Sequence, residues 1–156
     1  MKLYLMRHGQ AEATAPSDAQ RALTAHGVRQ ATAMGAFLLA EPPHSVYTSP
    51  YLRAVQTTEA VLSGAGLSSL GYSLAPGITP DDDPRVAFKW LARLGDRGPV
   101  LVVSHNPFIS LLFSLLTQGH LQAGVSLSTA DLVCLDTGDE GISPGGATVA
   151  WVERAP

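Results

Sequence analysis

Residues 3–12 read LYLMRHGQAE, a short apolar run that changes abruptly to polar residues. The run at 3–6 predicts a buried β-strand, because apolar residues continue until a charged and turn-forming cluster begins. Arg7, His8 and Gly9 follow at the point where this strand ends. Ligands of open α/β sheets bind at the carboxyl ends of the strands. The stretch therefore predicts a strand of an α/β sheet and the beginning of a ligand site.

Two further segments repeat this layout. A strand expected at 44–48 leads into a helix that carries Arg53 in its first turn. A β-branched run at 99–103, typical of a central parallel strand, ends just before His105 and a second helix. Because the carboxyl ends of parallel strands share one edge of a sheet, two arginines and two histidines should converge there on one crevice.

The rest of the chain alternates between helical and strand patterns. We expect helices over 24–40, 49–64, 84–94 and 106–119, and strands over 2–6, 44–48, 72–76, 99–103, 130–136 and 146–153. Ser49 is the expected N-cap of its helix, and Gly95 the expected end of the helix at 84–94. Helical spacing predicts these residues on buried faces: Val28, Ala31, Met34 and Leu38, then Leu52, Val55 and Leu62. The pattern indicates an α/β fold in three layers, with a largely parallel sheet and two further strands near the C-terminus.

Composition limits the possible classes of protein. The 156 residues, 46% of them hydrophobic and 15% charged, are expected to form one domain spanning 1–156. A net charge of −3 argues against a nucleic-acid surface. Cys134 is the only cysteine, which excludes an intrachain disulfide, and we expect it to be buried. The chain shows no signal-peptide pattern and no apolar run long enough for a bilayer, so we expect a cytoplasmic protein without a membrane partner.

The expected crevice has the chemistry of a phosphate site. Arginine forks and the N–H groups at helix starts bind phosphoryl oxygens, but neither attacks phosphorus. A neutral imidazole does, forming a phosphohistidine intermediate, and nearby positive charge favours the neutral form. One histidine would then be the nucleophile, and the other would donate hydrogen bonds to the transferring group. Gly9 would allow a backbone N–H to approach the phosphate closely.

Four ordered motifs carry a resemblance to a known family. LMRHGQAE, SPYLRAVQTTE and VVSHNP resemble the motifs of the histidine phosphatase (phosphoglycerate-mutase-like) superfamily. DAQRALTAHGVRQA resembles a stretch of one small branch, the SixA-type phosphohistidine phosphatases. The resemblance implies a phosphoglycerate-mutase-like α/β/α sandwich and a phosphatase that needs no metal or cofactor. It also implies that His8 is the nucleophile and that Arg7, Arg53 and His105 complete the phosphate pocket.

The sequence departs from the superfamily at one position. Most members carry a glutamate that protonates the leaving alcohol, and Gly77 stands where we would look for it. Asp81, Asp82 and Asp83 follow as possible substitutes. An alkoxide needs a proton from the enzyme, whereas a phosphorylated imidazole leaves easily without one. This favours phosphohistidine on a protein as the substrate.

The favoured partner is a histidine-phosphorylated protein, such as a phosphorelay component, with inorganic phosphate as the product. A phosphatase for small phosphate esters or phosphoanhydrides is the first alternative, and a non-catalytic module that binds phosphate groups is the second. Asp18 and Arg21 form either the rim of the substrate site or a plain ion pair within a loop. No metal-binding spacing of histidines is present in the sequence.

Overall fold

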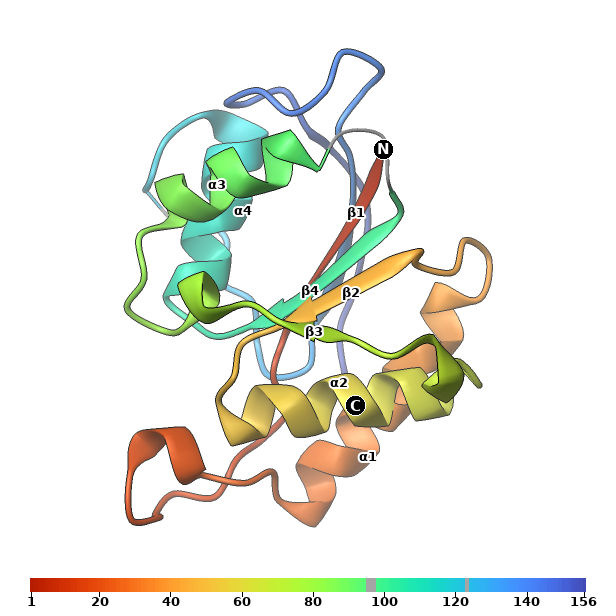
Figure 1. Cartoon of the computed structure of the whole chain (residues 1–156), viewed down its shortest axis with the longest axis vertical. Coiled ribbons are helices and arrows are strands. Elements are labelled where there is room, and N and C mark those ends of the chain that lie inside the picture. The colour runs from red at the N-terminus through yellow and green to blue at the C-terminus, as the bar shows by residue number, and fades with distance from the viewer. Residues whose placement is uncertain (95–97, 123) are drawn as a thin grey trace.

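The computed structural model describes residues 1–94, 98–122 and 124–156, and a six-stranded sheet lies at its centre (Figure 1). Across the sheet the strand order is β3-β2-β4-β1-β5-β6. The first four strands in this order pair in parallel, whereas β5 pairs antiparallel with β1 and β6 pairs antiparallel with β5. The strands are β1 (Lys2–Arg7), β2 (Ser45–Thr48), β3 (Ser73–Leu74), β4 (Val100–Ser104), β5 (Leu132–Asp136) and β6 (Thr148–Glu153). The expected largely parallel sheet with C-terminal antiparallel strands is thus confirmed.

Helices cover both faces of the sheet, which gives the three layers expected (Figure 1). One pair packs on one face and the second pair on the other. The described residues form these α-helices: α1 (Ala25–Met34), α2 (Leu52–Gly64), α3 (Pro84–Arg93) and α4 (Phe108–Gln118). Gly95, the expected end of α3, lies outside the described residues.

The hydrophobic core has two parts, one on each face of the sheet, and the side chains of each strand alternate between them. Leu3 and Leu5 of β1 pack in the cluster that holds α3 and α4, while Tyr4 and Met6 pack in the cluster that holds α1 and α2. Successive side chains of a strand point to opposite faces, so each strand serves both clusters. Every residue of β4 is buried, as expected for a central strand covered on both faces.

The buried face of α2 differs from the predicted one. Leu52 is 38% exposed and Val55 is half-buried, so the middle of the buried face carries small and hydroxyl residues in their place. The buried residues of the helix are Arg53, Ala54, Thr57, Thr58, Val61 and Leu62. Both threonines donate their hydroxyl hydrogen to the carbonyl four residues earlier, which satisfies the buried oxygen. Small residues suit this face because α2 packs closely against α1. The prediction is confirmed for Leu62 and wrong for Leu52, because it followed the spacing of large apolar residues and did not consider small ones.

Two further predictions for helices were also wrong. Val28 is 43% exposed, although Ala31 and Met34 of the same helix are buried. Helix α2 begins later than expected, with Tyr51 at its N-cap position, and Ser49 lies before the helix. Ser49 is therefore not the N-cap residue, and its side chain instead contacts His105 in the candidate site.

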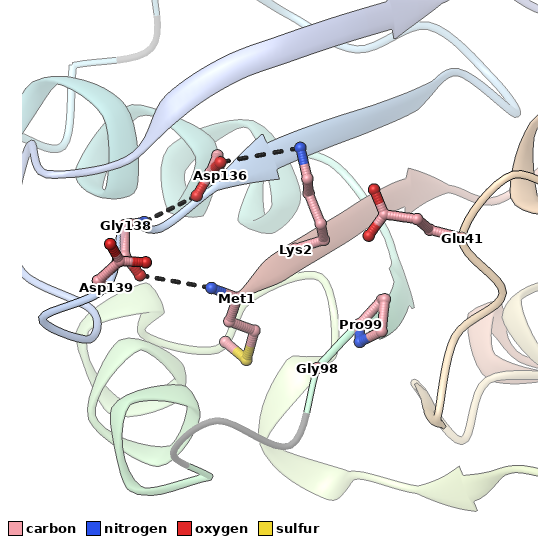
Figure 2. A pocket seen from close by; sticks show the side chains of 8 residues that line it. All are labelled: Met1, Lys2, Glu41, Gly98, Pro99, Asp136, Gly138 and Asp139. Atoms are coloured by element: carbon pink, nitrogen blue, oxygen red, sulfur yellow. Dashed lines mark hydrogen bonds and ion pairs between the residues drawn. The ribbon is translucent and has the colours of Figure 1, made fainter.

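A pocket lies where β1 begins, and Figure 2 shows it. It has a volume of about 480 Å³, and an ion pair of 3.8 Å between Lys2 Nζ and Asp136 Oδ2 forms one wall. Its lining residues are Met1, Lys2, Glu41, Gly98, Pro99, Asp136, Gly138 and Asp139. Since Arg7 and His8 lie at the other end of β1, this pocket is separate from the expected site.

The fold bears on two predictions from the sequence, the burial of Cys134 and the lack of a membrane-spanning segment. Cys134 is buried in β5, as expected. Within the described ranges, no helix is long and apolar enough to cross a bilayer.

Candidate active site

The carboxyl edge of the parallel strands brings the predicted side chains together. His8 follows β1 and His105 follows β4, and their rings lie 5.2 Å apart between centroids. Arg53 lies in the first turn of α2, and its Nε is 3.4 Å from His8 Nε2. The backbone holds His8 in place, because its N–H donates to Ser104 O at 2.9 Å and its carbonyl accepts from Ala130 N at 2.9 Å.

The hydrogen bonds of His8 define its tautomer. Nδ1 lies 2.7 Å from the carbonyl oxygen of Gly9. A carbonyl oxygen only accepts, so Nδ1 must carry the hydrogen in this bond. Nε2 then holds the lone pair, and the Arg53 Nε–H points toward it. The ring nitrogen that faces the arginine is therefore the one that can act as a nucleophile.

The surroundings keep His8 neutral. Burial lowers the pKa of His8 to about 4, and the charges of Arg53, Arg7 and Arg21 act in the same direction, against the hydrogen bond to Gly9. His8 is only 6% exposed. At neutral pH its imidazole is thus unprotonated at Nε2, as nucleophilic attack requires.

Gly9 is fixed by close packing. Its N–H donates to Thr57 Oγ1 at 3.0 Å, and an added Cβ would lie 2.6 Å from the carbonyl oxygen of Gly27. No side chain fits in that space, so the packing of the loop against α1 already requires glycine here. A role for Gly9 as a phosphate ligand stays a prediction.

Arg53 is buried and held by Asp18. Its Nη1 donates to Asp18 O at 2.7 Å, and its Nη2 donates to Asp18 Oδ2 at 3.1 Å. The guanidinium also lies 5.2 Å from the centre of the Tyr51 ring. A guanidinium has five N–H hydrogens, so two remain on Arg53 for another acceptor beside His8.

Asp18 joins two arginines. Its second carboxylate oxygen accepts from Arg21 Nη1 at 2.8 Å, so the loop ion pair considered from the sequence is present and extends to Arg53. Slight burial raises the pKa of Asp18, but hydrogen bonds from Arg21 and Arg53 outweigh it and hold the pKa below its usual value. Asp18 is therefore ionised at neutral pH, and whether it and Arg21 contact substrate stays a prediction.

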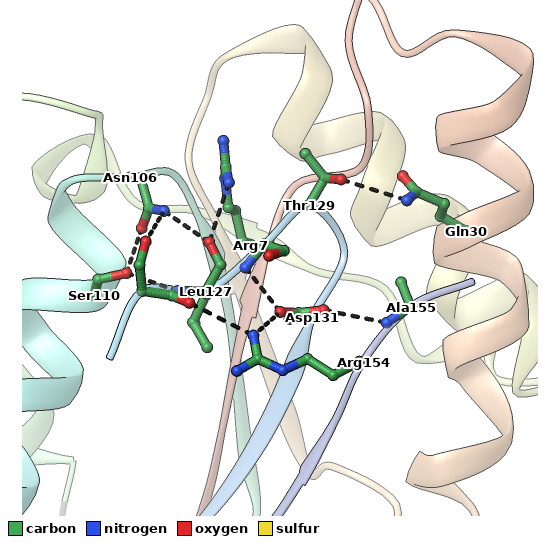
Figure 3. Close-up of polar contacts among 11 residues, drawn as sticks. Arg7, Gln30, Asn106, Ser110, Leu127, Thr129, Asp131, Arg154 and Ala155 are labelled. Carbon is green, nitrogen blue, oxygen red and sulfur yellow. Dashed lines mark hydrogen bonds and ion pairs between the residues drawn. The ribbon is translucent and has the colours of Figure 1, made fainter. Parts of the chain in front are cut away.

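Arg7 is held by the loop that precedes β5 (Figure 3). Its Nη1 donates to Leu127 O at 3.1 Å, and its backbone N–H donates to Asp131 O at 3.2 Å. Asn106 Nδ2 donates to the same Leu127 oxygen at 2.8 Å, and Arg154 forms an ion pair with the buried Asp131. The loop is thus fixed from both sides, and it fixes the direction of the Arg7 guanidinium.

His105 completes the group. It is 1% exposed, and its Nε2 lies 2.6 Å from Ser49 Oγ. Burial lowers the pKa of His105 to about 3, and the nearby His8, Arg53 and Arg7 also lower it, against the charge of Asp18. Like His8, it is neutral at ordinary pH.

Two buried nitrogens of this group have no hydrogen-bond partner within the described residues: Arg7 Nε and His105 Nδ1. Buried polar atoms are nearly always paired in native proteins. A tetrahedral oxyanion that accepts from both would satisfy them, which is the chemistry expected of a phosphoryl pocket.

Sequence reasoning missed three features that hold the site. Ser49 contacts His105 and Thr57 contacts Gly9, and both Ser49 and Thr57 belong to the SPYLRAVQTTE segment, so a signal was available. The carbonyl of Leu127 has no such signal, because any residue supplies one.

Comparisons with known proteins support the family resemblance of the sequence motifs. The model of the histidine phosphatase superfamily (branch 1) matches residues 3–73. The phosphohistidine phosphatase SixA of Escherichia coli strain K12 is 34% identical over 145 residues, which cover 90% of this chain and 89% of that protein. The chain belongs to the histidine phosphatase superfamily. The SixA homologue of Haemophilus influenzae is 34% identical over 119 residues, covering 70% of this chain and 73% of its own.

A solved structure supports the same membership in the superfamily. The structure of the protein histidine phosphatase SixA complexed with tungstate matches with a TM-score of 0.86 and 29% identity, covering 99% of this chain and 97% of that one. The family resemblance and the histidine phosphatase fold predicted from the motifs are confirmed. The chain is a SixA-like histidine phosphatase.

The aspartates that could replace the superfamily's acid have local partners. Asp82 Oδ2 accepts from the N–H and the hydroxyl of Thr79, at 2.8 and 2.6 Å. Asp83 caps α3 by accepting from Arg85 N, and the Arg85 side chain lowers the pKa of Asp83. Asp81 is exposed to solvent. In the part of the chain that the structure describes, none of the three forms a hydrogen bond with either histidine.

No cluster of three or more possible metal ligands occurs among residues 1–94, 98–122 and 124–156. The expectation of a reaction without metal or cofactor stays a prediction.

Proposed function

We propose that this chain removes the phosphoryl group from phosphohistidine on a protein, through a covalent phosphohistidine formed on His8. One observation carries the proposal. The site combines a neutral imidazole and buried cationic donors with a carboxylate, Asp18, that is held ionised by Arg21 and Arg53. Such a site can attack and bind a phosphoryl group, and among the described residues no protonated carboxyl group is hydrogen-bonded to either histidine to protonate an alcohol.

In the first step, His8 Nε2 attacks phosphorus and forms a P–N bond. The P–N bond of the substrate breaks, and its imidazole leaves as a neutral ring if its other nitrogen already carries a proton. Phosphorylated His8 is then a cationic ring, and the carbonyl of Gly9 stabilises it by accepting from Nδ1–H. Arg7, Arg53 and His105 face the charge that builds up on the phosphoryl oxygens.

In the second step, water attacks phosphorus and the bond to His8 Nε2 breaks. The products are inorganic phosphate and neutral His8, with its lone pair restored. The low pKa of His8, about 4, makes its nitrogen a good leaving group for this step. Neither step requires a proton from a carboxyl group.

The partner we infer is a histidine-phosphorylated protein, such as a component of a phosphorelay. The relatives named as phosphohistidine phosphatases support this substrate class. We also infer that residues 1–156 act as one domain, since a single sheet takes strands from Lys2 to Glu153. The cytoplasmic location stays a prediction.

The substrate class is tested by comparing two leaving groups. Turnover of a histidine-phosphorylated protein should exceed that of a simple alkyl phosphate by at least about 10²-fold, because a general acid contributes about 10²–10⁴ to the loss of an alcohol. Release of inorganic phosphate measures both reactions. Equal rates would favour the small-ester alternative, and stoichiometric binding without phosphate release would favour the non-catalytic module.

Gly77 allows a matched control in the same assay. An added Cβ at Gly77 meets no atom within 4 Å, so a side chain can begin there without a clash. Gly77→Glu should raise alkyl phosphate hydrolysis by about tenfold if this position can supply the missing acid, whereas Gly77→Gln should not. An equal effect of both variants would show that the side chain acts otherwise than by giving a proton.

A further inference from the structure

Ser49 contacts His105, the second histidine of the site, through its side chain. Its side chain is completely buried at the end of β2, and Oγ lies 2.6 Å from His105 Nε2. Its Oγ also accepts from the backbone N–H of Tyr51, at 3.3 Å. The position therefore places a hydroxyl group between the start of α2 and the His105 ring.

The number of hydrogens on each group indicates which of Ser49 and His105 donates in the hydrogen bond between them. A neutral imidazole has one N–H and one lone pair. If Nε2 carried the hydrogen, Ser49 Oγ would accept from both His105 and Tyr51, and its own hydrogen would have no acceptor among the described residues. If Ser49 donates to Nε2, the hydroxyl is fully used and the ring hydrogen must be on Nδ1. The second arrangement leaves fewer buried groups unpaired, so it is favoured.

The unpaired atom of His105 fits this arrangement. Nδ1 is buried and has no partner within the described residues, as is also true of Arg7 Nε. A protonated Nδ1 would be a donor ready for a phosphoryl oxygen, whereas a bare Nδ1 would repel one. The two histidines would then present opposite groups: a lone pair from His8 Nε2 and an N–H from His105 Nδ1.

We propose that Ser49 is a positioning residue, which donates its hydroxyl hydrogen to His105 and so holds that ring as a phosphoryl donor through Nδ1. Ser49 does not touch the substrate in this scheme. The proposal deepens the proposed function and rests on it, because it gives His105 a role toward the phosphoryl group.

The tautomer is measured directly by ¹⁵N NMR on the wild-type chain, with the His105 signals assigned from a His105→Ala variant. We expect Nδ1 at the chemical shift of a protonated ring nitrogen and Nε2 at that of an unprotonated one. The reverse assignment would overturn the proposal. This readout needs no substrate, so it stands apart from a failure of the phosphohistidine assay.

The functional consequence is measured with inorganic phosphate as the probe, in a double-mutant cycle. Ser49→Ala should weaken phosphate binding by about tenfold, the value of one good hydrogen bond, and should cost nothing further when His105 is already alanine. Ser49→Thr, which keeps the hydroxyl, should restore most of the affinity. An equal loss in both backgrounds would show a general structural role for Ser49 and would overturn the proposal.

Discussion

His8→Ala should lower the rate of phosphate release by at least about 10⁴-fold, the scale of loss seen when a catalytic nucleophile is removed. The reason is that Nε2 is the only attacking atom in the scheme, and alanine has no atom to replace it. The backbone bonds of His8 to Ser104 and Ala130 do not depend on the side chain, so the fold should survive. Steady-state phosphate release and thermal unfolding measure the two effects.

A matched control is available at the other end of the sheet. His44 is exposed and lies just before β2 begins, far along the strand from the site. His44→Ala should keep wild-type turnover. If His8→Ala kept turnover within about tenfold of wild type, the nucleophile would have to be another group and the mechanism would be wrong.

Arg53→Ala should lower kcat/KM by about 10³-fold, because it removes both a buried charge and a forked donor beside the nucleophile. Arg53→Lys should recover only part of this loss, since an ammonium has no planar fork. The affinity for inorganic phosphate should fall in both variants. Separate values of kcat and KM show whether binding, rate or both are lost.

Loss of Arg53 also frees Asp18, and this must be separated from the loss of the donor. The Asp18 side chain is 55% exposed, so water can solvate it once the arginine is gone. Arg85→Ala is the control for loss of an ion pair alone, because Arg85 pairs with Asp83 at 2.9 Å but is 68% exposed, whereas Arg53 is 5% exposed. Full activity of Arg53→Ala, or equal losses at Arg53 and Arg85, would contradict the role given to Arg53.

The sequence predicted the edge of the sheet where the site lies, for a simple physical reason. Each of three strands ends at a cluster of polar residues. Parallel strands place their carboxyl ends along the same edge of the sheet, so these polar clusters lie close together. This placed His8, Arg53 and His105 in one region without any knowledge of contacts. The alternating burial along β1 and the continuous burial of β4 follow from the same patterns.

What the sequence did not predict depends on packing between distant segments. The buried face of α2 carries Ala54 and Thr57 in place of larger apolar residues, because close packing against α1 favours small side chains. Asp18 reaches Arg53 across 35 residues of chain, and the Leu127 carbonyl reaches Arg7 across 120. Such long-range contacts leave no periodic pattern, and a backbone carbonyl leaves no residue type to recognise.

Trapping the covalent intermediate tests the central claim most directly. The chain would be mixed with a histidine-phosphorylated protein that carries labelled phosphate, quenched in alkali within milliseconds, and mapped by mass spectrometry. The mechanism predicts a transient phosphoryl group on His8 that is stable in alkali and released by acid, and that is missing in His8→Ala. Rapid turnover of the same substrate with no label on His8 at any time, or with label on another residue, would contradict it.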